Sequence, residues 1–79
     1  MNGRPRALAI WTVYDHPSDY PDKFVARRFY IDGSGHHASG SIIISSDLER
    51  LRNILALEMH LTRLVRDPSD EPQIVESWL

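Results

Sequence analysis

The chain of 79 residues carries a formal net charge of −2, from 11 acidic and 9 basic residues, and contains no cysteine. This length allows one domain, and the missing thiols exclude disulfides and thiolate metal sites, which favours a reducing cytoplasm. The slightly acidic balance argues against a dedicated nucleic-acid binder, and the apolar runs are far shorter than the about 20 residues that span a membrane. We therefore expect a single cytoplasmic domain over residues 1–79 that does not enter a membrane.

The first half of the chain predicts a β-hairpin with a long connection. Residues 1–6 are polar and have no hydrophobic period, so we expect a frayed N-terminus there. Residues 7–14 are apolar on both alternating rows, which is typical of a central strand. Residues 23–31 alternate more clearly and form the expected second strand, which carries two adjacent arginines among aromatic side chains.

The segment after this hairpin is rich in glycine, serine and histidine. Residues 32–41 have the composition of a turn, so we expect a mobile loop, one form of which is a long hairpin loop. Three consecutive isoleucines at residues 42–44 are too few for a helix. They suit either a brief extra strand or an apolar plug before the helix.

A helix is expected from residue 46, because Ser-Asp-Leu-Glu at residues 46–49 matches a capping box with Ser46 as the N-cap. Leucine and isoleucine side chains then recur on one helical stripe. A helix continued to Arg66 would turn charged side chains such as Glu58 toward the core, which is costly for unpaired charges. We therefore expect the helix to end near residues 57–59.

The remaining residues complete an α+β fold. Residues 61–66 are expected to form a strand, residues 67–72 a turn, and residues 73–79 a final strand. The expected architecture is a small antiparallel sheet of about four strands with one helix packed on one face, in ββαββ order. Because both rows of the first strand are apolar, the pattern does not assign the face that the helix covers. Open edge strands would favour a homodimer through the sheet edge or addition of a partner's strand.

Three segments resemble a family of small uncharacterised bacterial proteins that are often associated with prophages. They are Tyr-Asp-His-Pro at residues 14–17, Tyr-Pro-Asp-Lys-Phe-Val-Ala-Arg-Arg at residues 20–28, and Ile-Val-Glu followed closely by Trp-Leu at residues 74–79. The resemblance spans most of the chain. It departs at residues 58–60, where Glu-Met-His stands in place of a Pro-Gly-like break. It implies a phage-linked setting and no established activity.

The candidate binding residues cluster in and after the hairpin connection. They are Asp15, His16, Asp19, Tyr20, Asp22, Lys23, Arg27 and Arg28. Carboxylates and an imidazole this close together could hold a hard cation or a basic ligand, but their spacing does not match a calcium loop. The same side chains can cap turns, and the two prolines stiffen the connection, so a structural role or a protein contact is favoured.

The adjacent arginines allow two interpretations. With the neighbouring aromatic side chains they could form a stacking platform with phosphate-binding arms. Adjacent strand residues point to opposite faces, however, so Arg27 and Arg28 cannot both serve one groove. We expect one of them to lie across the sheet edge or to pair with a carboxylate such as Glu76.

Other residue types of chemical interest have simpler interpretations. His36, His37 and His60 offer no fixed set of zinc ligands, so solvated histidines are expected. Trp11 and Trp78 are expected to anchor the core, as tryptophans in a small domain usually do. No nucleophile elbow, phosphate-binding loop or zinc-protease motif is present, so the sequence assigns no catalytic residue, no metal ligand and no cofactor.

The leading hypothesis is a non-catalytic protein-interaction module of phage or prophage origin, which binds a protein partner through a sheet face and residues 15–22. The alternative is a small nucleic-acid-binding accessory protein that uses Lys23, Arg27 or Arg28 with aromatic side chains of the sheet. A third and weaker hypothesis is a hydrolase or metal-dependent enzyme centred on Asp15, His16 and Asp19.

Overall fold

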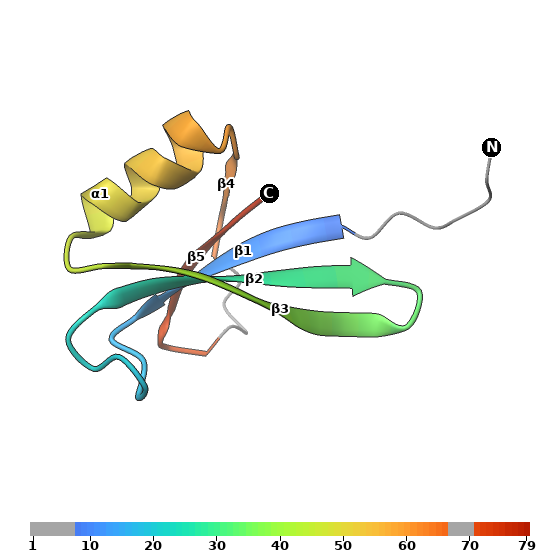
Figure 1. The fold of residues 1–79 in the computed structure, drawn as a ribbon, viewed down its shortest axis with the longest axis horizontal. Coiled ribbons are helices and arrows are strands. Elements are labelled where there is room, and N and C mark those ends of the chain that lie inside the picture. The colour runs from blue at the N-terminus through green and yellow to red at the C-terminus, as the bar shows by residue number, and fades with distance from the viewer. Residues whose placement is uncertain (1–7, 67–70) are drawn as a thin grey trace.

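Five strands form one antiparallel sheet, and one helix lies across one of its faces (Figure 1). The computed structural model describes residues 8–66 and 71–79, so the expected frayed residues 1–6 and most of the expected turn at residues 67–72 lie outside the described residues. The strands are β1 (Leu8–Asp15), β2 (Phe24–Asp32), β3 (Gly35–Ser45), β4 (Arg63–Leu64) and β5 (Ile74–Trp78). Their order in the sheet is β3-β2-β1-β5-β4.

Most of the segment expected to be a loop at residues 32–41 is strand. β3 pairs with β2 from the Asp32–Gly35 pair to the Phe24–Ser45 pair, and the connection between the strands is a tight turn. The amide and the hydroxyl of Ser34 both donate to the Asp32 carboxylate, at 2.8 and 2.7 Å, which closes this turn. Pairing with β2 overrides a local composition that disfavours strands. The sheet therefore has five strands rather than about four, and the element order is βββαββ.

The helical segment begins one residue later than expected. It consists of α1 (Leu48–Asn53) and a π-helical continuation, η1 (Ile54–Glu58). Asp47 is the N-cap rather than Ser46, because its carboxylate accepts the Glu49 amide at 3.0 Å. The Glu49 carboxylate pairs with Arg52 along the same helix, so the expected capping box is wrong.

The helix ends at Glu58, within the expected window. The Met59 amide donates to the Ile54 carbonyl at 3.0 Å, which widens the last turn to the π-helical spacing. His60 then adopts a left-handed backbone conformation with φ 56°, in the place where helices commonly end on glycine. The chain thus reverses here without a proline or a glycine.

The strand expected at residues 61–66 is reduced to β4. Beyond Leu64, the Arg66 guanidinium donates to the backbone carbonyls of Ile74 at 2.9 Å and Glu71 at 3.2 Å. A side chain therefore occupies the edge of β5 where further strand residues would have paired. The final strand, β5, is also one residue shorter at each end than the expected strand at residues 73–79.

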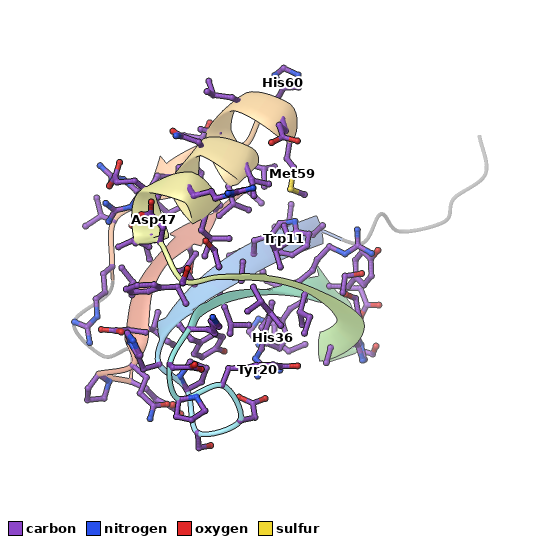
Figure 2. All side chains as sticks on the ribbon, turned by 60° about the vertical axis from the view of Figure 1, so that its left-hand side comes forward. Trp11, Tyr20, His36, Asp47, Met59 and His60 are labelled. Atoms are coloured by element: carbon purple, nitrogen blue, oxygen red, sulfur yellow. The ribbon has the colours of Figure 1, made fainter. Side chains whose placement is uncertain are left out.

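The core lies between the helix and one face of the sheet, which we call the covered face. Its buried apolar side chains are Trp11, Val13, Ala26, Leu51, Leu55 and Trp78. Both tryptophans are core anchors, as expected, with exposed fractions of 6% and 5%. In Figure 2, Trp11 and Met59 lie between the helix and the sheet, whereas Tyr20 and His36 lie on the other side of the sheet.

Candidate functional site

The opposite side of the sheet, which we call the open face, is apolar and is not covered by any helix of the described residues (Figure 1). Strand pairing sets Ile10 beside Phe29 and Leu8 beside Ile31 on this face. On the outer strands it adds Ile42 and Ile44 of β3, and Ile74 and Ser77 of β5. Leu8, Ile42 and Ile44 expose 49%, 38% and 40% of their surface. Contiguous apolar surface of this kind is typical of an interaction site.

The open face is hollowed at its centre. A depression of about 370 Å³ is lined by Ile10, Thr12, Tyr14, Phe29, His36, Ile74 and Ser77, which come from β1, β2, β3 and β5. The lining is mostly apolar, and the Ser77 hydroxyl and the His36 imidazole are among its polar groups. The sheet twist and the bulge between Val13 and Tyr14 on the β5 side shape this surface.

The connection between β1 and β2 folds beside the open face and is held by its own backbone. The His16 amide donates to the Lys23 carbonyl at 2.9 Å, and the Tyr20 amide donates to the Pro17 carbonyl at 2.9 Å. Pro17 is buried and Tyr20 is half-buried, whereas Asp22 is exposed. Backbone hydrogen bonds therefore give this connection a defined turn structure.

An ion pair ties this connection to the sheet. The Arg27 guanidinium donates to the Asp19 carboxylate and also lies over the Tyr14 ring, 5.7 Å from its centroid. The hydrogen bond from Arg27 holds the pKa of Asp19 below its ordinary value of 3.8. Arg27 thereby sits on the open face with its charge compensated.

The other carboxylate and histidine of the connection form a separate contact. The Asp15 carboxylate hydrogen-bonds to His16 Nδ1, and the His16 ring packs edge-on against Phe24 with 5.0 Å between ring centroids. His16 has a left-handed backbone, φ 52°, which makes the sharp exit from β1. Asp15, His16 and Asp19 are thus divided between two contacts rather than brought to one centre.

Arg28 lies on the covered face, opposite to Arg27, as strand alternation predicts. Its guanidinium stacks over the rings of Trp11 and Tyr30, at 5.7 and 5.1 Å from their centroids. One of the two arginines, Arg27, pairs with a carboxylate as expected, but the partner is Asp19 and not Glu76. Glu76 is bound by Arg52 of α1 instead, because both side chains face the same core.

The histidines are spread over the molecule. His37 hydrogen-bonds to Asp32 and Ser34 at the β2–β3 turn, and His36 and His60 lie on opposite sides of the sheet (Figure 2). Within residues 8–66 and 71–79, no three His, Cys, Asp or Glu side chains are grouped as metal ligands.

The apolar row of the open face was not identified as a site from the sequence. Ile10, Tyr14 and Phe29 looked like ordinary strand residues. The available signal was that both rows of β1 are apolar while the sequence predicts a single helix to cover them.

Comparison of the sequence with protein-family models and with curated proteins, and of the fold with solved structures, finds no match. No helix in the described part of the chain is long and apolar enough to cross a membrane.

Proposed function

We propose that this chain is a non-catalytic protein-binding module whose open face receives the apolar side of an amphipathic helix from a partner protein. The observation that carries the proposal is the exposed apolar face with its depression of about 370 Å³, opposite the face that α1 covers. A sheet with two apolar faces is stable when both are covered, and within residues 8–66 and 71–79 a helix covers one of them. The resemblance to prophage-associated proteins adds the expectation that the partner is a phage or host protein.

The dimensions of the face suit a helix. β1, β2 and β3 have 8, 9 and 11 residues and β5 has 5. At about 3.3 Å per residue and about 4.8 Å per strand, the surface is on the order of 26 Å long over three strands, and about 19 Å wide where β5 adds a fourth. A helix of about 17 residues would cross its longer dimension. The face is nearly neutral because Arg27 is paired with Asp19, so it complements an apolar rather than a strongly charged surface.

A second copy of the chain is a poorer occupant. In a two-fold dimer centred on the depression, the depressions of the two copies would face each other and leave an unfilled space. One side of a helix is a convex apolar surface and would fill the depression. The connection carrying Tyr20 and Asp19 lies beside this surface and would contact the end of such a helix.

The experiment compares Phe29→Ala, in the depression, with Leu57→Ala, an equally apolar control that is 70% exposed on the helix. Proteins retained by the wild type from lysate are identified, and the retained partner's helical segment is titrated calorimetrically. We expect binding with a negative heat-capacity change, weakened by about tenfold or more in Phe29→Ala and unchanged in Leu57→Ala. Equal weakening by both variants, or a wild type that light scattering shows as a dimer closed through the open face, would overturn the proposal.

The alternative proposal is nucleic-acid binding through Lys23, Arg27 or Arg28. The placement of the two arginines on opposite faces, and of Asp19 against Arg27, weighs against a continuous basic surface. Phosphate-backbone binding must weaken steeply with salt, so saturable, salt-sensitive binding of an oligonucleotide would favour this alternative.

A further inference from the structure

Arg28 is a half-buried cation without a counterion in the described part of the chain. The other two half-buried arginines, Arg27 and Arg52, each contact a carboxylate, Asp19 in one case and Glu49 and Glu76 in the other. No carboxylate within residues 8–66 and 71–79 forms an ion pair with Arg28, whose neighbours are two aromatic rings and two serine hydroxyls. Partly buried charges are usually neutralised by a partner, so the missing counterion calls for an explanation.

Arg28 and Ser41 each have a hydrogen-bond donor that no described residue accepts. Arg28 Nε donates to the Ser39 hydroxyl at 3.3 Å, and Nη2 donates to the Ser41 hydroxyl at 3.1 Å. Nη1 donates to no atom of the described residues, although a guanidinium offers five N–H groups. The Ser39 hydroxyl is fully used, because it also accepts the Ser41 amide and donates to the Arg28 carbonyl. The Ser41 hydroxyl accepts from Arg28 but has no acceptor for its own proton among the described residues.

The β2–β3 bulge holds these groups in place. The pairing register shifts between Arg27 and Phe29, so that the segment Ser39, Gly40 and Ser41 lies opposite Arg28. Gly40 has φ 83°, which permits the bulge and directs both serine hydroxyls to the guanidinium. Stacking on Trp11 and Tyr30 further restrains the arginine before any ligand arrives, which lowers the entropy lost on binding.

We propose that Arg28 and Ser41 form a binding site for a single carboxylate of a protein partner, either an acidic side chain or a chain terminus. The planar guanidinium edge matches the two oxygens of a carboxylate, and the free Ser41 hydroxyl adds a donor beside it. A nucleic acid would require a row of cations, whereas the row of β2 that carries Arg28 continues with Tyr30 and the carboxylate of Asp32. This site lies on the covered face of the sheet and does not depend on the open face being an interface.

The test is an NMR titration of the full chain with acetate at constant ionic strength. The Arg28 Nε–H and Ser41 amide signals report on the site, and parallel titrations use inorganic phosphate and a single-stranded oligothymidine. We expect saturable shifts with acetate in the millimolar range, about tenfold weaker binding in Ser41→Ala, and loss of saturation in Arg28→Gln. The matched control Arg50→Gln removes the same charge from an exposed helix position and should bind as the wild type does.

Some results would contradict the existence of the site, and others would contradict only its assignment to a carboxylate. Shifts that grow linearly without saturation, or that respond equally to Arg50→Gln and Ser41→Ala, would show general charge screening and overturn the site. Saturation by phosphate or oligothymidine but not by acetate would overturn the carboxylate assignment. If Arg28→Gln fails to fold, the wild-type and Ser41→Ala titrations still decide, because Ser41→Ala leaves the guanidinium in place.

Discussion

Arg52 donates hydrogen bonds to the carboxylate of Glu76 through two nitrogens, with Nη2 2.9 Å from Oε1 and Nε 3.2 Å from both oxygens. Glu76 is buried, with only 4% of its surface exposed. The indole of Trp78 donates to the same carboxylate at 2.8 Å. The helix and β5 are therefore joined by a polar contact inside an otherwise apolar core. The contact from Glu76 also raises the pKa of Arg52, which stays charged.

Removing Arg52 should leave this buried carboxylate with two weaker partners, the Trp78 indole and the exposed Arg63, whose Nη1 lies 3.9 Å from Glu76 Oε1. We expect Arg52→Met to lower the free energy of unfolding by about 3 kcal/mol, measured by urea denaturation, while Arg50→Met on the exposed side changes it by less than about 0.5 kcal/mol. Arg52→Met combined with Glu76→Gln should recover at least half of the loss, because the amide still accepts the Trp78 indole without a buried charge. If the double variant recovers no unfolding free energy, the loss comes from the packing of the arginine stem and not from the carboxylate that lacks Arg52.

Truncation to alanine should lower the free energy of unfolding at Leu55 but leave it almost unchanged at Leu57. Leu55 is fully buried in the core and Leu57 is 70% exposed on the same helical segment. We expect Leu55→Ala to cost about 2–5 kcal/mol of unfolding free energy and Leu57→Ala to change it by less than about 0.5 kcal/mol. Thermal and urea unfolding followed by circular dichroism measure both, and similar losses would contradict the core described above.

A side chain at Gly40 should lower the stability of the fold because of the backbone conformation there, and not because of a steric clash. A Cβ at this position meets no atom within 4 Å, but φ 83° is a conformation that other residues rarely adopt. We expect Gly40→Ala to destabilise the chain by about 1 kcal/mol and to shift the Ser39 and Ser41 amide signals. Gly33→Ala, where a Cβ also meets nothing, serves as control and should be nearly neutral; equal effects would remove the special role of the bulge.

The Asp19–Arg27 ion pair should make the hairpin connection sensitive to acid. Arg27 lowers the pKa of Asp19 in the folded chain below 3.8, so the pair stabilises the fold above the unfolded-state pKa and is lost as pH falls through the lower folded value. We expect the Tm difference between wild type and Asp19→Asn to be constant from about pH 7 to pH 5 and to vanish toward about pH 2. Asp22→Asn, which removes an exposed carboxylate outside any ion pair of the described residues, should show no such dependence. A difference that persists at the acid end would indicate that the amide itself perturbs the turn.

Local sequence signals were sufficient for the fold class, the first hairpin and the end of the helix. β1 is a run of strand-forming residues that is apolar on both rows, β2 alternates more clearly, and charged residues from Glu58 onward make a longer helix unfavourable. These features depend on neighbours close in the chain, and their pattern survives in any tertiary context. The N-cap was misplaced by one residue because both Ser46 and Asp47 are good caps and their local patterns differ little.

Part of the candidate site followed from sequence as well. The residues of the hairpin connection were identified, and strand alternation correctly separated Arg27 from Arg28. Their partners were not predictable, because Asp19 and Ser41 reach the two arginines through a turn and a bulged strand pairing that no short pattern encodes.

Two features arise from contacts between segments distant in the chain. β3 reaches eleven residues because its first seven, at 35–41 and of weak strand composition, lie along β2 together with the three isoleucines that follow, and local propensity does not encode this pairing. The open face exists because the helix packs on the row of Trp11 and Val13 rather than on that of Ile10 and Tyr14. Both rows are apolar, so the periodicity of β1 predicts two buried faces equally. The choice between them comes from the packing of Leu51, Leu55 and Trp78 around the Arg52–Glu76 pair, a set of interactions that forms only when the helix and β5 come together.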